Sequence, residues 1–96
     1  MAKYILLVDW TEQGVRGVRE SPARLDAARK TAATVGARIE QMFMVMGDHD
    51  MVLIVEAPND DAVATFVLRV AEGGNIRTTT LKAFTEDQYR GLLGAL

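Results

Sequence analysis

Three short segments of this chain are apolar at both odd and even positions, and this pattern limits the folds open to it. Residues 4–10, 38–46 and 51–57 are rich in β-branched, aromatic and aliphatic side chains and have the length of strands. In the last of them, Met51, Leu53 and Val55 alternate with Val52 and Ile54. A sheet with one face in water alternates apolar and polar residues. Both faces of this sheet therefore need to be buried against other parts of the protein or against a partner.

Start and stop signals indicate two helices between the strands. Ser21 and Pro22 form a favourable helix start, and Gly36 supplies a stop. The second helix opens at residues 58–60, with Asn59 or Asp60 as its cap, and ends at residues 73–75. Apolar residues recur at helical spacing in both segments; they are Leu25, Ala28, Ala32 and Val35, then Val63, Phe66, Val67 and Val70.

The order of the expected elements defines the fold class. Residues 11–20 form a loop or a brief helical turn, residues 47–50 connect two strands as a hairpin, and residues 76–84 form a fourth strand. A short last helix follows, capped within residues 85–87. The order β-α-β-β-α-β predicts an α+β, ferredoxin-like fold: a four-stranded antiparallel sheet with two helices on one face. We expect residues 1–96 to form a single domain of this kind.

The doubly apolar sheet predicts self-association. Two helices cover only one face, and a bare apolar face of this size is larger than soluble monomers usually expose. A second copy packed sheet against sheet would cover it, which predicts a homodimer or a higher homo-oligomer. The alternative is that the C-terminal helix folds back over the open face, although about ten residues are few for that task.

Composition excludes several classes of protein. The chain has 96 residues, with 11 Lys and Arg against 13 Asp and Glu, a balance that argues against a nucleic-acid binder. It has no Cys and a single His, so we expect no disulfide, no metal site and no cofactor. No segment approaches the ~18 apolar residues of a membrane span, and no signal peptide is evident. We therefore expect no membrane partner and a cytoplasmic location.

The hairpin and its surroundings resemble a known family. Residues 47–50 (Gly-Asp-His-Asp), running into residues 51–58, resemble the signature of the GYD-domain family of small bacterial and archaeal proteins. Further matches are Trp10-Thr11, residues 75–78 and residues 83–86. The resemblance implies a ferredoxin-like fold assembled as a dimeric α/β barrel, and it carries no settled biochemical function. His49 stands where the family has its Tyr.

The same hairpin is locally similar to one in the effector-binding domain of the leucine-responsive transcription regulators. There a Gly-x-Tyr-Asp turn contributes to a small-ligand site between subunits. Residues 47–50 match that turn except at His49. This likeness implies a free-standing sensor, because the chain has no room for a DNA-reading module.

Six residues are candidates for a ligand-binding site: Trp10, Gly47, His49, Asp50, Thr78 and Thr80. His49 is the one side chain whose ordinary pKa lies near neutrality; it either contacts a ligand or is a solvated hairpin residue. Asp50 either holds a ligand amine or bonds backbone amides of the turn. Trp10 either stacks on a planar ligand or plugs the mouth of the barrel with its own ring.

The remaining candidates have structural alternatives of the same kind. Gly47 is expected to supply a positive φ angle. Thr78 and Thr80 share one face of the fourth strand, and Arg77 and Thr79 share the other. One of these sets would form a polar lining if it pointed between packed sheets; otherwise they mark an exposed edge. The stripe of Met42, Met44 and Met46 is either a pliable pocket lining or a plain core or interface.

Two functions follow from these residues. The first is a non-enzymatic oligomeric module that binds a small apolar or amphipathic ligand between packed sheets. The alternative is a cofactor-free enzyme of the dimeric α/β-barrel type, an isomerase or oxygenase acting on a small planar substrate. Its acid or base would be His49, Asp9 or Glu56, and we assign no catalytic residue. A buried Asp9 or Glu56 lining a pocket would favour the enzyme.

Overall fold

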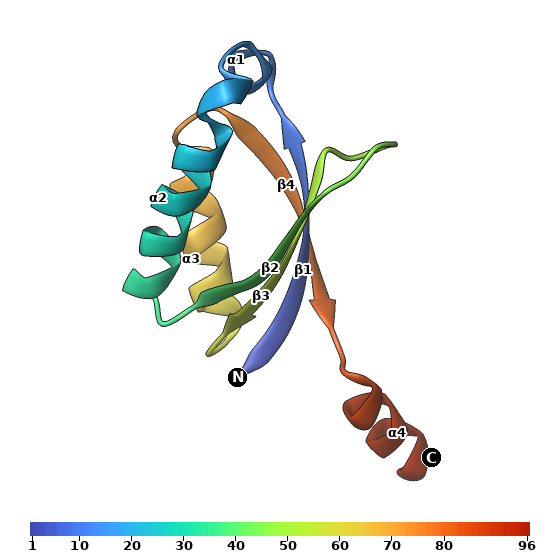
Figure 1. Cartoon of the computed structure of the whole chain (residues 1–96). Helices are drawn as coiled ribbons and strands as arrows, with labels where there is room; N and C mark the ends of the chain where they lie inside the picture. The colour runs from blue at the N-terminus through green and yellow to red at the C-terminus, as the bar shows by residue number, and fades with distance from the viewer.

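The computed structural model describes residues 1–96 and has the expected order of elements (Figure 1). The strands are β1 (Ala2–Trp10), β2 (Arg38–Met44), β3 (Met51–Ala57) and β4 (Ile76–Ala83). The helices are α1 (Glu12–Arg16), α2 (Ser21–Thr34), α3 (Asp60–Ala71) and α4 (Glu86–Gly94), with a 3₁₀ turn η1 (Val18–Glu20) before α2. This confirms the α+β, ferredoxin-like fold.

The four strands form one sheet in the order β2-β3-β1-β4, and every neighbouring pair is antiparallel. The two crossover helices α2 and α3 lie on the same face of the sheet (Figure 1). The two central strands, β1 and β3, pair directly, with Leu6 opposite Leu53 and Tyr4 opposite Val55. The fold therefore has two layers, one of helices and one of strands.

The core lies between the sheet and the two helices. Val8 and Val55 are fully buried there, together with Phe66 of α3. Twelve buried hydrophobic residues make up this core: Tyr4, Leu6, Val8, Ala32, Ala37, Ile39, Met51, Leu53, Val55, Ala57, Val63 and Phe66. Those on β1 and β3 come from alternate positions, as period-two strands require.

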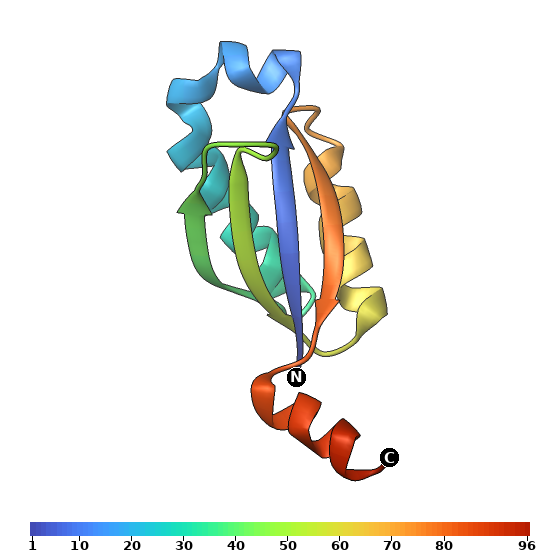
Figure 2. The ribbon, with the colours of Figure 1, turned by 90° about the vertical axis from the view of Figure 1, so that its right-hand side faces the viewer.

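The other face of the sheet is apolar and is covered by no helix (Figure 2). We call it the open face and define its apolar centre by six residues at alternate strand positions: Ile5, Leu7, Phe43, Val52, Ile54 and Leu81. The register places Ile54 and Leu81 on either side of Ile5, and Leu7 and Phe43 on either side of Val52. The doubly apolar pattern of the sequence is thus confirmed in three dimensions.

Helix α4 does not fold back over the open face. It follows β4 beyond the end of the sheet where β1 begins and stands clear of the other elements (Figures 1 and 2). Thr85 caps it, as expected, and Gln88 completes a reciprocal capping box. The alternative that α4 covers the open face of its own chain is therefore not adopted.

Several expected boundaries were wrong. β1 begins at Ala2 rather than at residue 4. β2 ends at Met44 rather than residue 46, so its connection to β3 has six residues, and Met46 lies outside the sheet. Ser21 is the first residue of α2 rather than its cap, because η1 already gives Glu20 and Ser21 helical backbone angles. β4 ends at Ala83, one residue before the expected end. The expected cap of α3 is present: the Asn59 side chain accepts a hydrogen bond from the amide of Ala62 at 2.9 Å.

None of the helices has both the length and the apolar character needed to cross a membrane.

The β1–α1 junction docks closely against the α3–β4 junction. The Thr11 amide donates to the carbonyl of Asn75 at 3.0 Å, and the Thr11 hydroxyl donates to the carbonyl of Gly74 at 2.6 Å. A Cβ on Gly14 would lie 1.9 Å from the Asn75 carbonyl oxygen. The contact therefore requires glycine at position 14.

Substitution of Gly14 tests this junction. We expect Gly14→Ala to lower the free energy of unfolding by about 2–3 kcal/mol, because two backbones must move apart. Gly91→Ala is the matched control, since a Cβ there meets nothing within 4 Å and alanine favours helix. Urea unfolding of both variants measures the difference, and equal stability of the two would contradict the close approach.

Candidate functional site

Residues 45–50 join β2 to β3 and meet the end of β1; we call this segment the hairpin junction. Gly47 has a φ of 149°, a conformation that other residues adopt rarely, so the expectation of a positive φ holds. The junction extends past the sheet on the side of the open face (Figure 1). Its position is fixed by two aspartates and one histidine.

Asp50 ties the hairpin junction to β1. Its carboxylate accepts a hydrogen bond from the Trp10 amide at 2.9 Å, and its own amide donates to the Val8 carbonyl at 3.0 Å. Its carbonyl accepts from the Val45 amide at 2.9 Å, which closes the hairpin. Asp50 therefore bonds backbone groups, which was one of its two expected roles. The amide that its side chain binds is 40 residues away in sequence and does not belong to the turn.

His49 lies against Asp9. Its Nδ1 atom is 3.2 Å from both carboxylate oxygens of Asp9, and both side chains are about one-third exposed. Asp9 sits opposite Arg77 in the β1–β4 register. The structure thus brings an imidazole and a carboxylate together at one end of the open face, and the register places Arg77 beside them. We call these three residues the polar rim.

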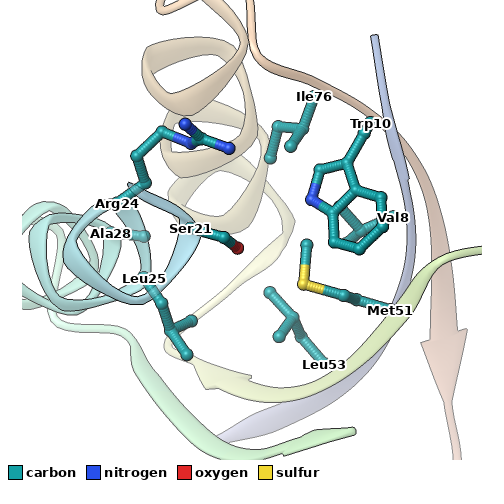
Figure 3. Close-up of a pocket in the computed structure, with 9 residues that line it drawn as sticks. All are labelled: Val8, Trp10, Ser21, Arg24, Leu25, Ala28, Met51, Leu53 and Ile76. Atoms are coloured by element: carbon teal, nitrogen blue, oxygen red, sulfur yellow. The ribbon is translucent and has the colours of Figure 1, made fainter. Parts of the chain in front are cut away.

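Trp10 points to the opposite side of the sheet, toward α2. It borders a cavity of ≈ 50 Å³ with Met51, Leu53 and Ile76 (Figure 3). The Ser21 hydroxyl points toward the same space, and the indole N–H of Trp10 is buried without a hydrogen-bond partner. The cavity is far smaller than the ~300 Å³ of a typical ligand pocket. Because Trp10 lies on the helix side of the sheet and His49 contacts Asp9 on the open face, the two residues do not share one site.

Thr78 and Thr80 also lie on the helix side of the sheet, because they pair with the buried residues Val8 and Leu6. Of the two sets of residues on β4, it is Arg77 and Thr79 that lie on the open face. Thr80 lines an open groove of ≈ 460 Å³ between β4 and α3. The six candidates are thus divided between two faces, with only His49, Asp50 and Gly47 at the hairpin junction.

One polar network was not predicted from the sequence. The Tyr4 hydroxyl donates a hydrogen bond to the carboxylate of Asp60, and the Lys82 ammonium lies 3.3 Å from the same oxygen. Lys82 also stands 5.4 Å above the Tyr4 ring. A Tyr at a core-facing position needs a partner for its hydroxyl, but nothing in the sequence points to a residue 56 positions away.

This network shifts two pKa values. The hydrogen bond to Asp60, together with burial, raises the pKa of Tyr4 to about 12. The Tyr4 hydroxyl and then the Lys82 ammonium hold the pKa of Asp60 below its usual value of 3.8. Both shifts favour a neutral phenol donating to a charged carboxylate at neutral pH.

The two carboxylates that bear on the enzyme hypothesis lie on the open face without being buried. The Asp9 side chain is 31% exposed and the Glu56 side chain 25%. Glu56 lies 3.7 Å from Lys3 and 3.5 Å from Arg38, so it belongs to a surface ion-pair cluster. No three His, Cys, Asp or Glu side chains are grouped to hold a metal ion.

The methionine stripe divides along its length. Met42 is half-buried and packs against the core, whereas Met44 and Met46 are exposed. Phe43, which lies between Met42 and Met44 in sequence and on the open face, is 50% exposed. The end of β2 and the hairpin junction therefore leave apolar surface uncovered.

Comparison with known proteins gives the family of the chain. The sequence profile of the GYD domain matches residues 4–93. The chain belongs to the GYD family. The match includes the hairpin junction. The expected family is thus confirmed.

A curated relative covers most of the chain. It is a Thermus thermophilus protein named "Glutamine synthetase and cystathionine beta-lyase binding protein", 30% identical over 84 residues. The alignment spans 86% of this chain and 88% of that protein.

Solved structures share the fold. A Thermus thermophilus structure is 20% identical with a TM-score of 0.56, covering 88% of this chain and 95% of its own. The leucine response regulatory protein of Mycobacterium tuberculosis is 16% identical with a TM-score of 0.65, covering 88% and 51%. A feast or famine regulatory protein from M. tuberculosis, solved with L-methionine, is 19% identical with a TM-score of 0.62, covering 92% and 55%. This chain thus spans about half the length of these regulators.

The Tyr4–Asp60 bond predicts an acid-dependent contribution to stability. Tyr4→Phe keeps the ring and removes the donor, and we expect the melting temperature at pH 7 to fall by roughly 3–6 °C. Because the pKa of Asp60 is lowered in the folded state, its contribution is present above the ordinary value of 3.8 and is lost as pH falls through the folded pKa.

The difference in melting temperature between the wild-type protein and Tyr4→Phe should therefore shrink as pH falls below 3.8. Thermal unfolding followed by circular dichroism across the acid range measures it. A difference that stays constant from neutral pH into this range would contradict the assigned bond.

Proposed function

We propose that this chain is a ligand-binding module that assembles sheet against sheet as a homodimer or higher homo-oligomer. It binds a small amphipathic molecule between the packed sheets, at the end bordered by the polar rim. The observation that carries the proposal is the open face itself: an apolar centre of six residues, with His49, Asp9 and Arg77 at one end.

The chemistry of the open face suits such a ligand. Small-molecule sites are mostly apolar, with a few polar groups that fix orientation. Ile5, Leu7 and Val52 supply apolar surface, while the carboxylate of Asp9 and the guanidinium of Arg77 offer opposite charges. A molecule with an apolar body and a charged or zwitterionic end would use both parts. Packing two open faces together would enclose it.

The comparisons support this interpretation at the level of fold. The regulator solved with L-methionine shares the ferredoxin-like arrangement, and the curated relative is named as a binding protein. L-Methionine is therefore the first probe, because it joins an apolar side chain to a zwitterionic end. L-Glutamine is a polar counterpart of similar length.

The enzyme alternative receives less support from the site. Asp9 and Glu56 point to the open face, but both are partly exposed; Asp9 contacts the His49 ring, and Glu56 is paired with Lys3 and Arg38. A carboxylate used for acid–base chemistry is usually one that burial has displaced from its ordinary pKa. A binding role needs only the charges that these residues already carry.

A second candidate function is binding to a metabolic enzyme. The 30% identical relative is named for binding glutamine synthetase and cystathionine β-lyase. This chain exposes apolar side chains on α4 and on the hairpin junction, which suit a protein partner. Co-purification with glutamine synthetase of the same host tests this role separately.

Native mass spectrometry of the protein purified from its own host is the decisive test. We expect a dimer or a multiple of it that carries extra mass from a retained small molecule. Leu7→Lys, in the open face, should shift the assembly to monomer because it buries a charge in the interface. Leu68→Lys is the matched control: Leu68 is exposed on α3, so the same change there should leave the assembly intact. A monomeric wild-type protein would overturn the proposal.

Binding is measured on the ligand-free protein by calorimetry with L-methionine. We expect the variant Arg77→Gln to weaken binding at least tenfold while it keeps the oligomeric mass, because it removes only a charge of the polar rim. Equal affinity of the wild-type protein and the variant would show that the polar rim is not part of the binding site.

A further inference from the structure

Helix α4 carries an apolar stripe that nothing in its own chain covers. Tyr89, Leu92 and Leu93 recur at positions i, i+3 and i+4, on one side of the helix, and Leu96 follows shortly after the helix ends. Leu92 is 54% exposed and Leu96 fully exposed. An isolated helix of nine residues is not stable in water. The stripe therefore requires a surface to pack on.

In the structure, α4 does not reach the open face of its own chain (Figures 1 and 2). Only Phe84 and Thr85 separate β4 from α4. The Gln88 amide donates to the Thr85 hydroxyl at 3.2 Å, and the Thr85 amide donates to the Gln88 side chain at 2.8 Å. These two bonds hold the first turn of the helix. Folding back onto the open face of the same chain would need the two-residue link to reverse the direction of the chain.

The position of α4 points to the open face of another molecule. It lies past the end of the sheet and is displaced toward the side away from α2 and α3 (Figure 1). Leu81 of the open face and Phe84 are both exposed, so apolar surface runs from the sheet along the link toward the helix. Beside the stripe, Arg90 and Glu86 pair at 2.7 Å, which marks a flank of α4 that stays in water.

We propose that α4 is an intersubunit arm whose apolar stripe packs on a second copy of this chain. The inference rests on the proposed sheet-to-sheet pairing and extends it. In a two-fold assembly, each copy gives an arm and receives one. The arm and the open face are both uncovered apolar surfaces of the chain, and one contact between two copies would cover both.

Paired charge substitutions test the arm. Leu92→Asp/Leu93→Asp places two carboxylates in the stripe, and we expect the dissociation constant of the dimer to rise at least tenfold. Gly91→Asp/Gly94→Asp adds the same charge on the opposite side of the helix, where a Cβ meets nothing within 4 Å. This control should change the constant less than twofold. Concentration-dependent sedimentation measures both, and equal constants for the two variants would overturn the proposal.

Comparison with Leu7→Lys separates the arm from the sheet pairing. If Leu7→Lys dissociates the dimer and Leu92→Asp/Leu93→Asp does not, the sheets pair and the arm proposal fails. If both variants dissociate it, both contacts are supported. If only the α4 variant dissociates it, the sheet-to-sheet pairing fails, and the arm fails as an extension of that pairing.

A photo-crosslinking residue at position 93 gives a direct readout in the intact dimer. Covalently joined pairs of chains support the arm, and products confined to single chains overturn it.

Discussion

The structure depends on one imbalance: the sheet is apolar on both faces, and the chain supplies helices for only one. β1 shows the imbalance most clearly. Tyr4, Leu6 and Val8 enter the core beneath α2 and α3, while Ile5 and Leu7 between them face outward. Burial of the first set gives the chain its core. The second set leaves an apolar surface exposed to water, which is unfavourable. Both the expected assembly and the proposed ligand site follow from this surface.

Much of this was predictable because it depends on local signals. Residues 51–57 were expected as a strand and are β3. The caps of α3 and α4 were expected at Asn59 or Asp60 and within residues 85–87, and they are Asn59 and Thr85. Strand alternation and capping operate over two to four residues, so the sequence displays them directly. The end of β2 was misplaced because Val45 and Met46 continue the apolar pattern after the strand has ended. Apolarity alone does not distinguish a paired residue from an unpaired one.

The site was less predictable because it depends on contacts between distant parts of the chain. Asp50 was recognised as a turn residue, but its bond to the Trp10 amide required the β1–β3 pairing to be known. The pairing of His49 with Asp9 spans the same separation. Thr78 and Thr80 were grouped correctly on one face, and only the register with Val8 and Leu6 shows that this face lies under the helices. Polar contacts of this kind have no periodicity from which to infer them.

The Tyr4–Asp60 bond has a further consequence, for the alignment of the strands. Slipping a strand by one residue exchanges its two faces, and in most sheets this is prevented because polar side chains would enter the core. A slipped β1 would bring Ile5 and Leu7 to the helix side at little hydrophobic cost, but it would also bring the charged side chains of Lys3 and Asp9 there. A slipped β1 would lose the bond from Tyr4 to Asp60 at one end and the bond from the Trp10 amide to Asp50 at the other. These two polar contacts therefore act together with the charges of Lys3 and Asp9 to fix the alignment of a strand whose central residues are apolar on both faces.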